Sequence, residues 1–105
     1  MSTEGIARHG IRLDQRALEA FCVRNGIKKL SLFGSALRPD FSADSDVDVL
    51  VEFAPGRVPG LAFFGMEIEL SGMLGRKVDL NTPGFIGPRF RRQVEAEAEA
   101  LYEQT

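Results

Sequence analysis

The sequence predicts a small α/β domain in which a three-stranded mixed sheet is flanked by helices. Three short runs rich in β-branched and aromatic residues alternate along the chain with segments of helical periodicity. The 105 residues, 44% hydrophobic and 27% charged, suffice for one domain with one modest core. We therefore expect a flexible lead-in over residues 1–12 and a single domain over residues 13–105.

The first expected helix begins after Asp14, whose side chain can cap it, and ends at Asn25-Gly26. Its apolar residues share one stripe: Ala17, Leu18, Phe21 and Cys22. We interpret Cys22 as a core residue rather than a nucleophile, because no histidine lies near it in the sequence. A lone cysteine also forms no internal disulfide, so folding needs no oxidation.

Two strands follow, joined by a short connection. The first covers residues 27–33 and ends at Gly34-Ser35, where at most one helical turn fits, because Pro39 disfavours helix in the residue before it. Residues 39–45 are expected to form a loop. The second strand covers residues 46–53, with its apolar side chains alternating on one face: Val47, Val49, Val51 and Phe53.

The second half of the chain predicts two helices and one strand. A helix is expected over residues 61–74, with Gly75 as its stop, and a strand over residues 76–81, with Asp79 facing away from the core. Pro88 opens a last helix. The apolar residues of that helix share one stripe: Phe90, Val94, Ala98 and Leu101.

The connections between strands indicate where polar side chains meet. Strands 46–53 and 76–81 are joined through a helix and should be parallel, whereas the short connection from strand 27–33 favours antiparallel pairing. This arrangement brings a set of chemically active residues to one edge of the sheet: Gly34, Ser35, Asp46, Asp48 and Asp79.

Three carboxylates beside a Gly-Ser turn suit a divalent cation and phosphate groups. Asp46 and Asp48 are two residues apart on a strand and face the same way, an arrangement that repulsion disfavours unless a cation binds there. Gly34 lets the backbone approach a phosphate, and Ser35 adds a hydroxyl at a helix N-terminus. The set predicts phosphoryl or nucleotidyl transfer.

The acidic residues of this segment admit other interpretations. Asp46 taken alone is equally consistent with a loop cap. A calcium loop beginning at Asp44 would need Gly in place of Val49 and Glu in place of Pro55, which excludes it. A P-loop is excluded because no Gly-Lys-Ser/Thr follows a glycine-rich turn. The remaining acidic and hydroxyl residues of this segment fit turn positions: Asp40, Asp44 and Ser45.

The segment "GSALRPDFSADSDVD" resembles the Gly-Ser, ten residues, Asp-x-Asp pattern of the DNA polymerase β-like nucleotidyltransferase superfamily. The flanking "LFGS", "SDVDVLVEF" and "LGRKVDL" are similar to the minimal nucleotidyltransferases, the antitoxin partners of HEPN-domain toxins. The resemblance extends from Leu18 to Tyr102. It implies a small nucleotidyltransferase domain, Mg²⁺-dependent attack on the α-phosphate of ATP, and release of pyrophosphate.

By motif position, the resemblance implies that Gly34 and Ser35 hold the triphosphate and that Asp46 and Asp48 bind the metals. Asp79 is implied as the third carboxylate, which ligates metal and accepts the proton of the attacking hydroxyl. Broader relatives often carry Gly after the residue equivalent to Arg38, where this chain has Pro. The contribution of Arg38 is therefore left open.

Chain length indicates the acceptor. Related polymerases and antibiotic-modifying enzymes carry more chain to grip primer or drug, so 105 residues leave the site open for a protein acceptor. The resemblance then implies an AMP-transferring antitoxin that modifies a HEPN-domain toxin. The alternative is a non-enzymatic binding module that neutralises its partner toxin by complex formation.

The helix over residues 61–74 carries two apolar stripes. Leu61, Phe64 and Ile68 form one, with Gly65 and Gly72 beside it. The other comprises Phe63, Met66, Leu70, Met73 and Leu74. Helices that are apolar nearly all round are buried on both sides, either by their own domain or by a partner or second copy. Homo- or hetero-oligomer contacts through this helix are therefore one of two open alternatives.

Charge and composition exclude several other classes. The net charge of −2 provides no basic field, so a nucleic-acid polymer is not expected as the main partner. No run approaches the about 20 apolar residues of a membrane span. The N-terminal "MSTEGIARHGIR" lacks the apolar core of a signal peptide, which predicts a cytoplasmic location.

Overall fold

The computed structural model describes residues 6–8, 11–38, 45–57 and 59–104. The predicted loop over residues 39–45, except Ser45, and the role ascribed to Pro39 lie outside this part of the chain. The elements follow in this order: β1 (Ile6–Arg8), β2 (Ile11–Leu13), α1 (Gln15–Arg24), β3 (Ile27–Leu32), the 3₁₀ turn η1 (Gly34–Leu37), β4 (Val47–Phe53), α2 (Ala62–Leu74), β5 (Val78–Asn81), the 3₁₀ turn η2 (Pro83–Phe85), α3 (Pro88–Glu97) and β6 (Glu99–Glu103).

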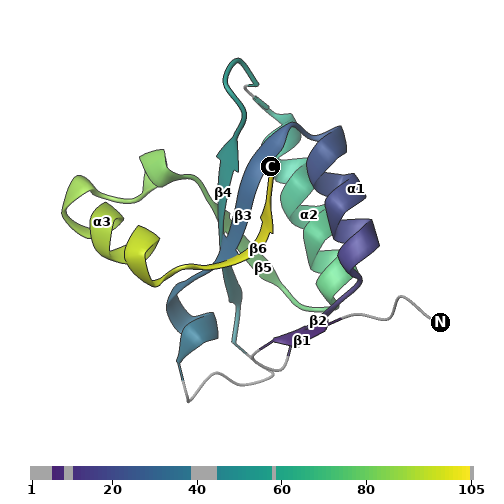
Figure 1. Ribbon diagram of the computed structural model, residues 1–105, viewed down its shortest axis with the longest axis horizontal. Coiled ribbons are helices and arrows are strands. Elements are labelled where there is room, and N and C mark those ends of the chain that lie inside the picture. Colours follow the sequence, from purple (N-terminus) through teal and green to yellow (C-terminus); the bar gives the residue numbers. More distant parts are fainter. Residues whose placement is uncertain (1–5, 9–10, 39–44, 58, 105) are drawn as a thin grey trace.

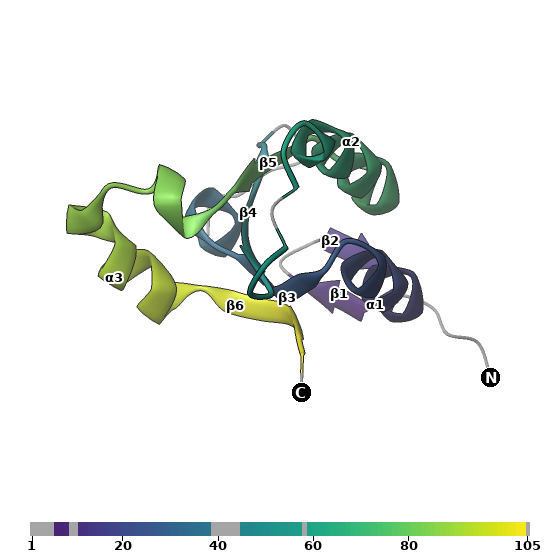
Figure 2. The same cartoon turned by 90° about the horizontal axis from the view of Figure 1, so that it is seen from above.

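The main sheet is mixed, with strand order β5-β4-β3-β6. Strand β4 pairs in parallel with β5 and antiparallel with β3, so both predicted pairings are confirmed. Helices α1 and α2 lie side by side on one face of the sheet, and α3 lies on the other side (Figures 1 and 2). The small α/β fold class is therefore confirmed.

The core lies between the sheet and helices α1 and α2. Val47, Val49 and Val51 of β4 are all 0% exposed, as their alternation predicted. Helix α2 contributes Met66, Leu70 and Leu74 to the same cluster. Fully burying an aliphatic side chain of this kind contributes about 1.5–3 kcal/mol, so this layer dominates the stability of the domain.

Helix α1 has the ends and the buried stripe that its sequence predicts. The Asp14 carboxylate accepts hydrogen bonds from the backbone N–H groups of Arg16 at 3.0 Å and Ala17 at 3.2 Å. Cys22 is fully buried, and burial raises the pKa of its thiol to about 12, with the Glu19 charge adding to the effect. The interpretation of Cys22 as a core residue is confirmed.

The C-terminal segment differs from the prediction. Helix α3 ends at Glu97, and Glu99–Glu103 forms a fourth strand, β6, antiparallel to β3. Leu101 is therefore buried from a strand rather than from the stripe that was expected to include Ala98. In a three-stranded sheet, the backbone N–H and C=O groups along one edge of β3 would lack hydrogen-bond partners, and β6 supplies them. The free energy of this pairing outweighs the helix preference of Ala and Glu.

The N-terminal segment also contains structure that was not predicted. Within the expected lead-in over residues 1–12, β1 pairs antiparallel with β2. Ile11 is fully buried in the core, and Leu13 is 4% exposed. The domain limit at residue 13 stays a prediction, although the core includes at least one residue before it. No helix in the described ranges is long and apolar enough to cross a membrane.

Candidate active site

The turn after β3 brings its backbone directly against Asp48. Gly34 has φ +63°, and a Cβ atom added there would lie 2.6 Å from Oδ2 of Asp48. The N–H of Phe33 also donates to the carbonyl oxygen of Asp48 at 3.0 Å. A side chain at position 34 would displace the Asp48 carboxylate from its present position. Glycine is therefore favoured by the backbone angle, and it also lets the carboxylate stay where it is.

Asp48 and Asp79 are direct neighbours across two parallel strands. They are register partners in the β4–β5 pair, flanked by the pairs Val47–Val78 and Val49–Leu80. Because those flanking side chains are buried, strand alternation places both aspartates on the opposite face of the sheet. Parallel strands lie about 4.8 Å apart, so the two carboxylates share one small region of that face.

The charges around Asp79 show that the acidic residues act on one another. The pKa of the Asp79 carboxyl lies above its ordinary value, first because of partial desolvation and then because of the negative charges of Asp48, Glu67 and Asp46. A hydrogen bond from Asn81 partly offsets this increase in the pKa. The negative charges of three other acidic residues therefore act on the Asp79 carboxyl.

Asp46 is the least closely gathered of the three predicted carboxylates. It is exposed, directly precedes β4, and has a carboxylate oxygen 4.0 Å from Nζ of Lys77. The neighbouring Ser45 carbonyl accepts a hydrogen bond from Nη2 of Arg76 at 2.9 Å. The segment that begins β4 thus lies against the basic residues that precede β5, and the metal-binding role of Asp46 stays a prediction.

Ser35 follows Gly34 within the short turn η1. Its backbone therefore begins one residue from the contact between Gly34 and Asp48. Beside the same turn lies a hollow of about 360 Å³ between η1 and helix α3, lined mainly by Phe33, Phe90 and Val94. The Gly-Ser turn is thus bordered by the acidic pair on one side and by an open, partly apolar hollow on another.

Glu67 was missed by the sequence analysis. Its Oε2 accepts a hydrogen bond from the backbone N–H of Leu80 at 2.8 Å, one residue beyond Asp79. The hydroxyl of Ser71 accepts from the N–H of Val78 at 3.0 Å. Helix α2 therefore satisfies the outer edge of β5 and adds a fourth negative charge near the predicted carboxylates. An acidic residue within a mostly apolar helix, where Glu69 is the other acid, was the sequence signal.

The donor set can be tested for its fit to a magnesium ion. Among the described residues, no three acidic, histidine or cysteine side chains are arranged to hold an ion by themselves. Magnesium in nucleotide sites commonly takes one or two carboxylates, and phosphates and water supply its other ligands. Asp48 and Asp79 together provide such a pair beside a backbone that a phosphate can approach. The residues fit a magnesium ion that arrives with a nucleotide.

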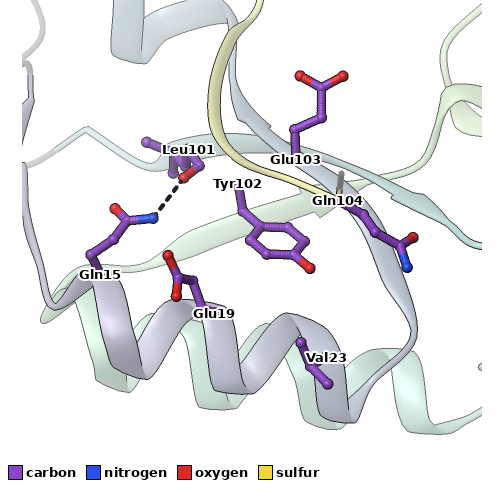
Figure 3. Close-up of a pocket in the computed structure, with 7 residues that line it drawn as sticks. All are labelled: Gln15, Glu19, Val23, Leu101, Tyr102, Glu103 and Gln104. Atoms are coloured by element: carbon purple, nitrogen blue, oxygen red, sulfur yellow. Dashed lines mark hydrogen bonds between the residues drawn. The ribbon is translucent and has the colours of Figure 1, made fainter.

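A second hollow lies at the opposite edge of the sheet. It measures about 570 Å³ and is formed by α1 and β6, with Gln15 donating from Nε2 to the Leu101 carbonyl at 3.2 Å (Figure 3). Its acidic side chains, Glu19 and Glu103, come from separate elements, and β3 and β4 separate it from Asp79. It contributes nothing to the acidic site.

A family model, a curated relative and a solved structure are similar to this chain over most of its length. A nucleotidyltransferase domain model matches residues 15–101. A Methanocaldococcus jannaschii protein named "putative protein adenylyltransferase" is 33% identical over 84 residues, which cover 80% of this chain and 89% of that protein. The solved structure of a "putative minimal nucleotidyltransferase" is 37% identical, covers 80% of this chain and 85% of the other, and superposes with a TM-score of 0.67.

One more distant structure supports the fold alone. It is a tri-AMPylated Shewanella oneidensis HEPN toxin in complex with its MNT antitoxin. That structure is 20% identical, covers 86% of this chain and 70% of the other, and has a TM-score of 0.59.

Proposed function

The chain belongs to the nucleotidyltransferase domain family as a minimal nucleotidyltransferase, and we propose that it transfers AMP from ATP to a hydroxyl group of a partner protein. We propose that the partner is a HEPN-domain toxin, that this chain is its antitoxin, and that the two proteins bind each other in the cytoplasm. The observation that carries the proposal is the contact of Gly34 with Asp48, which is itself paired with Asp79.

In this proposal Gly34 and Ser35 hold the triphosphate through the backbone, where no side chain prevents close approach. Asp48 and Asp79 would hold the magnesium ion that accompanies ATP, and Asp46 would add its charge at the start of β4. When bound, the ion neutralises charge on the phosphate oxygens. The two carboxylates would keep that ion beside the Gly-Ser turn, on the face of the sheet that the acceptor would approach.

In the proposed transfer, the α-phosphorus exchanges one oxygen substituent for another. The acceptor hydroxyl oxygen forms a bond to the α-phosphorus while the bond from that phosphorus to the bridging oxygen of pyrophosphate breaks. The hydroxyl proton goes to an oxygen of the Asp79 carboxylate, the more exposed member of the Asp48–Asp79 pair. Products are an AMP phosphodiester on the partner and pyrophosphate.

The proposal is tested by incubating the chain with a purified HEPN-domain protein from the same genome, with and without Mg-ATP, followed by intact mass spectrometry. We expect the partner to gain one or more AMP units only when both magnesium and ATP are present. Asp48→Asn should abolish the gain, whereas Glu103→Gln, an exposed acid on β6 at the opposite edge of the sheet, should not.

A second outcome would favour the alternative of a non-enzymatic binding module. In that case the partner would be inhibited and captured in a stable complex by wild type and Asp48→Asn alike, with no change in its mass. If inhibition of the partner requires Asp48 and is accompanied by a gain in its mass, AMP transfer is supported. If the partner is inhibited without Asp48 and without a mass gain, AMP transfer is rejected.

A further inference from the structure

The outward face of helix α2 is apolar and exposed. Leu61 is 86% exposed, Phe64 64% and Ile68 73%, although residues of this type are ordinarily buried. Gly65 and Gly72 are exposed on the same face. We call these five residues the outer stripe. They lie opposite Met66 and Leu70, which pack into the core, so the stripe faces directly away from the sheet.

The outer stripe is continuous and carries no charge along its centre. Its members recur at spacings of three and four residues, as in a helix face that packs against another helix. The nearest charges, Arg24 and Glu69, form an ion pair with each other at the side of the stripe. The stripe offers no charged group to pair with a strongly charged partner. A neutral apolar helix could cover it without desolvating a charge.

The spacing of large and small residues makes the stripe complementary to itself. In a two-fold pair of antiparallel helices, if residue i of one copy faces residue j of the other, then j also faces i. The register that places Ile68 over Gly65 of a second copy also places Leu61 over Gly72. Leu61 and Ile68 of each copy then meet a glycine, and Phe64 faces position 69 at the side of the stripe. The two helices can therefore approach closely at the four glycine positions.

We propose that the outer stripe of α2 is the contact between two copies of this chain, packed antiparallel about a two-fold axis. The Arg24–Glu69 pair is neutral overall, so a second copy adds no net like charge at the rim. The proposal is independent of the transfer activity, because the stripe faces away from the sheet face that holds Asp48 and Asp79.

The exposed area fits a reversible dimer rather than a permanent one. A large side chain presents roughly 150–250 Å² when fully exposed, so the three large residues offer several hundred Å² in each copy. Two copies together stay below the about 1,200 Å² at which specific, stable interfaces begin, in the range of weak and transient contacts. Association at micromolar rather than nanomolar concentrations is therefore expected.

Analytical ultracentrifugation of the isolated chain over a range of concentrations tests the proposal. We expect monomers at low and dimers at high micromolar concentration. Ile68→Asp should remove the dimer, and Val23→Asp should retain it. Val23 is a matched control because it is 68% exposed but lies on α1 at the hollow shared with β6 (Figure 3). A wild type that stays monomeric at every concentration would overturn the proposal.

A second variant separates the antiparallel pair from general hydrophobic association. Nothing lies within 4 Å of a Cβ atom built on Gly65, so Gly65→Leu leaves the monomer folded and adds apolar surface. The proposed register has no room for that side chain, and the dimer should weaken by about tenfold or more. Unchanged or tighter association of Gly65→Leu would reject the register, and this result does not depend on whether Ile68→Asp folds.

Cysteine cross-linking tests the direction of the helices. Mixed chains carrying Gly65→Cys and Ile68→Cys should form a disulfide between unlike chains, and Cys22 stays inert because it is fully buried. Disulfides only between like chains would indicate parallel packing and contradict the proposal. Loss of binding to the purified HEPN-domain partner in Ile68→Asp, with a monomeric wild type, would instead assign the stripe to that partner.

Discussion

Gly34→Ala separates the two reasons for glycine at this position. The substitution forces alanine into φ +63°, which costs about 1–2 kcal/mol, and places its Cβ atom 2.6 Å from Oδ2 of Asp48. The matched control is Gly75→Ala at the end of α2, where φ is +67° and nothing lies within 4 Å of the new atom. Both variants carry the backbone cost, and only Gly34→Ala disturbs the carboxylate.

The expected effects on stability are similar for the two variants. The Asp48 oxygen is at the end of a half-buried side chain that can turn away, so most of the collision is relieved by moving the carboxylate. Each variant should therefore unfold about 1–2 kcal/mol more easily, a decrease in melting temperature of about 4–8 °C per kcal/mol for a domain of this size. Thermal unfolding followed by circular dichroism measures this quantity.

The effects on nucleotide binding should differ. Mg-ATP at about 100 times its Kd stabilises a binding-competent domain by about 2.7 kcal/mol. We expect Gly75→Ala to show the same stabilisation as wild type and Gly34→Ala to show little, because its Asp48 carboxylate is displaced. Equal stabilisation of both variants by Mg-ATP would refute the assignment of the contact between Gly34 and Asp48 to the nucleotide site.

Three further predictions follow from the surroundings of single groups. Because the pKa of Asp79 is raised, the folded state binds more protons than the unfolded chain, so the destabilising effect of this carboxyl is absent at low pH and grows as pH rises through the ordinary value of 3.8 to the raised value. Without metal, Asp79→Asn should therefore melt at or above the temperature of wild type at neutral pH, and the difference should vanish in acid; a variant less stable at neutral pH would contradict this. Cys22, with a pKa of about 12, should resist alkylation by iodoacetamide at pH 8 until the chain is unfolded, and rapid labelling of the native protein would show that it is not buried. Glu67→Gln should keep the acceptor for the Leu80 N–H and lower the pKa of Asp79, which NMR titration would follow. Glu67→Ala should also decrease the free energy of unfolding by about 1–3 kcal/mol, because that N–H would lose its acceptor. Equal stability of the two variants would show that the hydrogen bond is unimportant.

The parts of the fold that were predicted correctly depend on local signals. Asp14 as a cap, Gly75 as a stop and the alternation of Val47 with Val49 each act within a few residues, so the sequence states them directly. The pairing of β4 with β5 also follows from connection length alone. The juxtaposition of Asp48 and Asp79 was therefore predictable, because it requires only the correct register of those two strands.

The parts that were missed depend on contacts distant in the sequence. The segment containing Ala98 and Leu101 has helix-forming residues at helical spacing, and only the open edge of β3 decides that it forms a strand. Ile11 is likewise buried by tertiary packing, and the residues around it in the sequence show no periodicity that predicts this burial. Glu67 accepts a hydrogen bond from the backbone N–H of Leu80 at the edge of β5. The need for an acceptor at that N–H follows from the assembled sheet and not from the local sequence.

Helix α2 links the two surfaces proposed here. Its inner and lateral residues bury Leu70 in the core and fix β5 through Ser71 and Glu67, the strand that carries Asp79. Its outer residues are free to meet another molecule, since neither hydrogen bond to β5 involves them. Contact on the outer stripe would therefore leave the acidic site accessible. A dimer through α2 would leave both acidic sites open to a nucleotide and a partner protein.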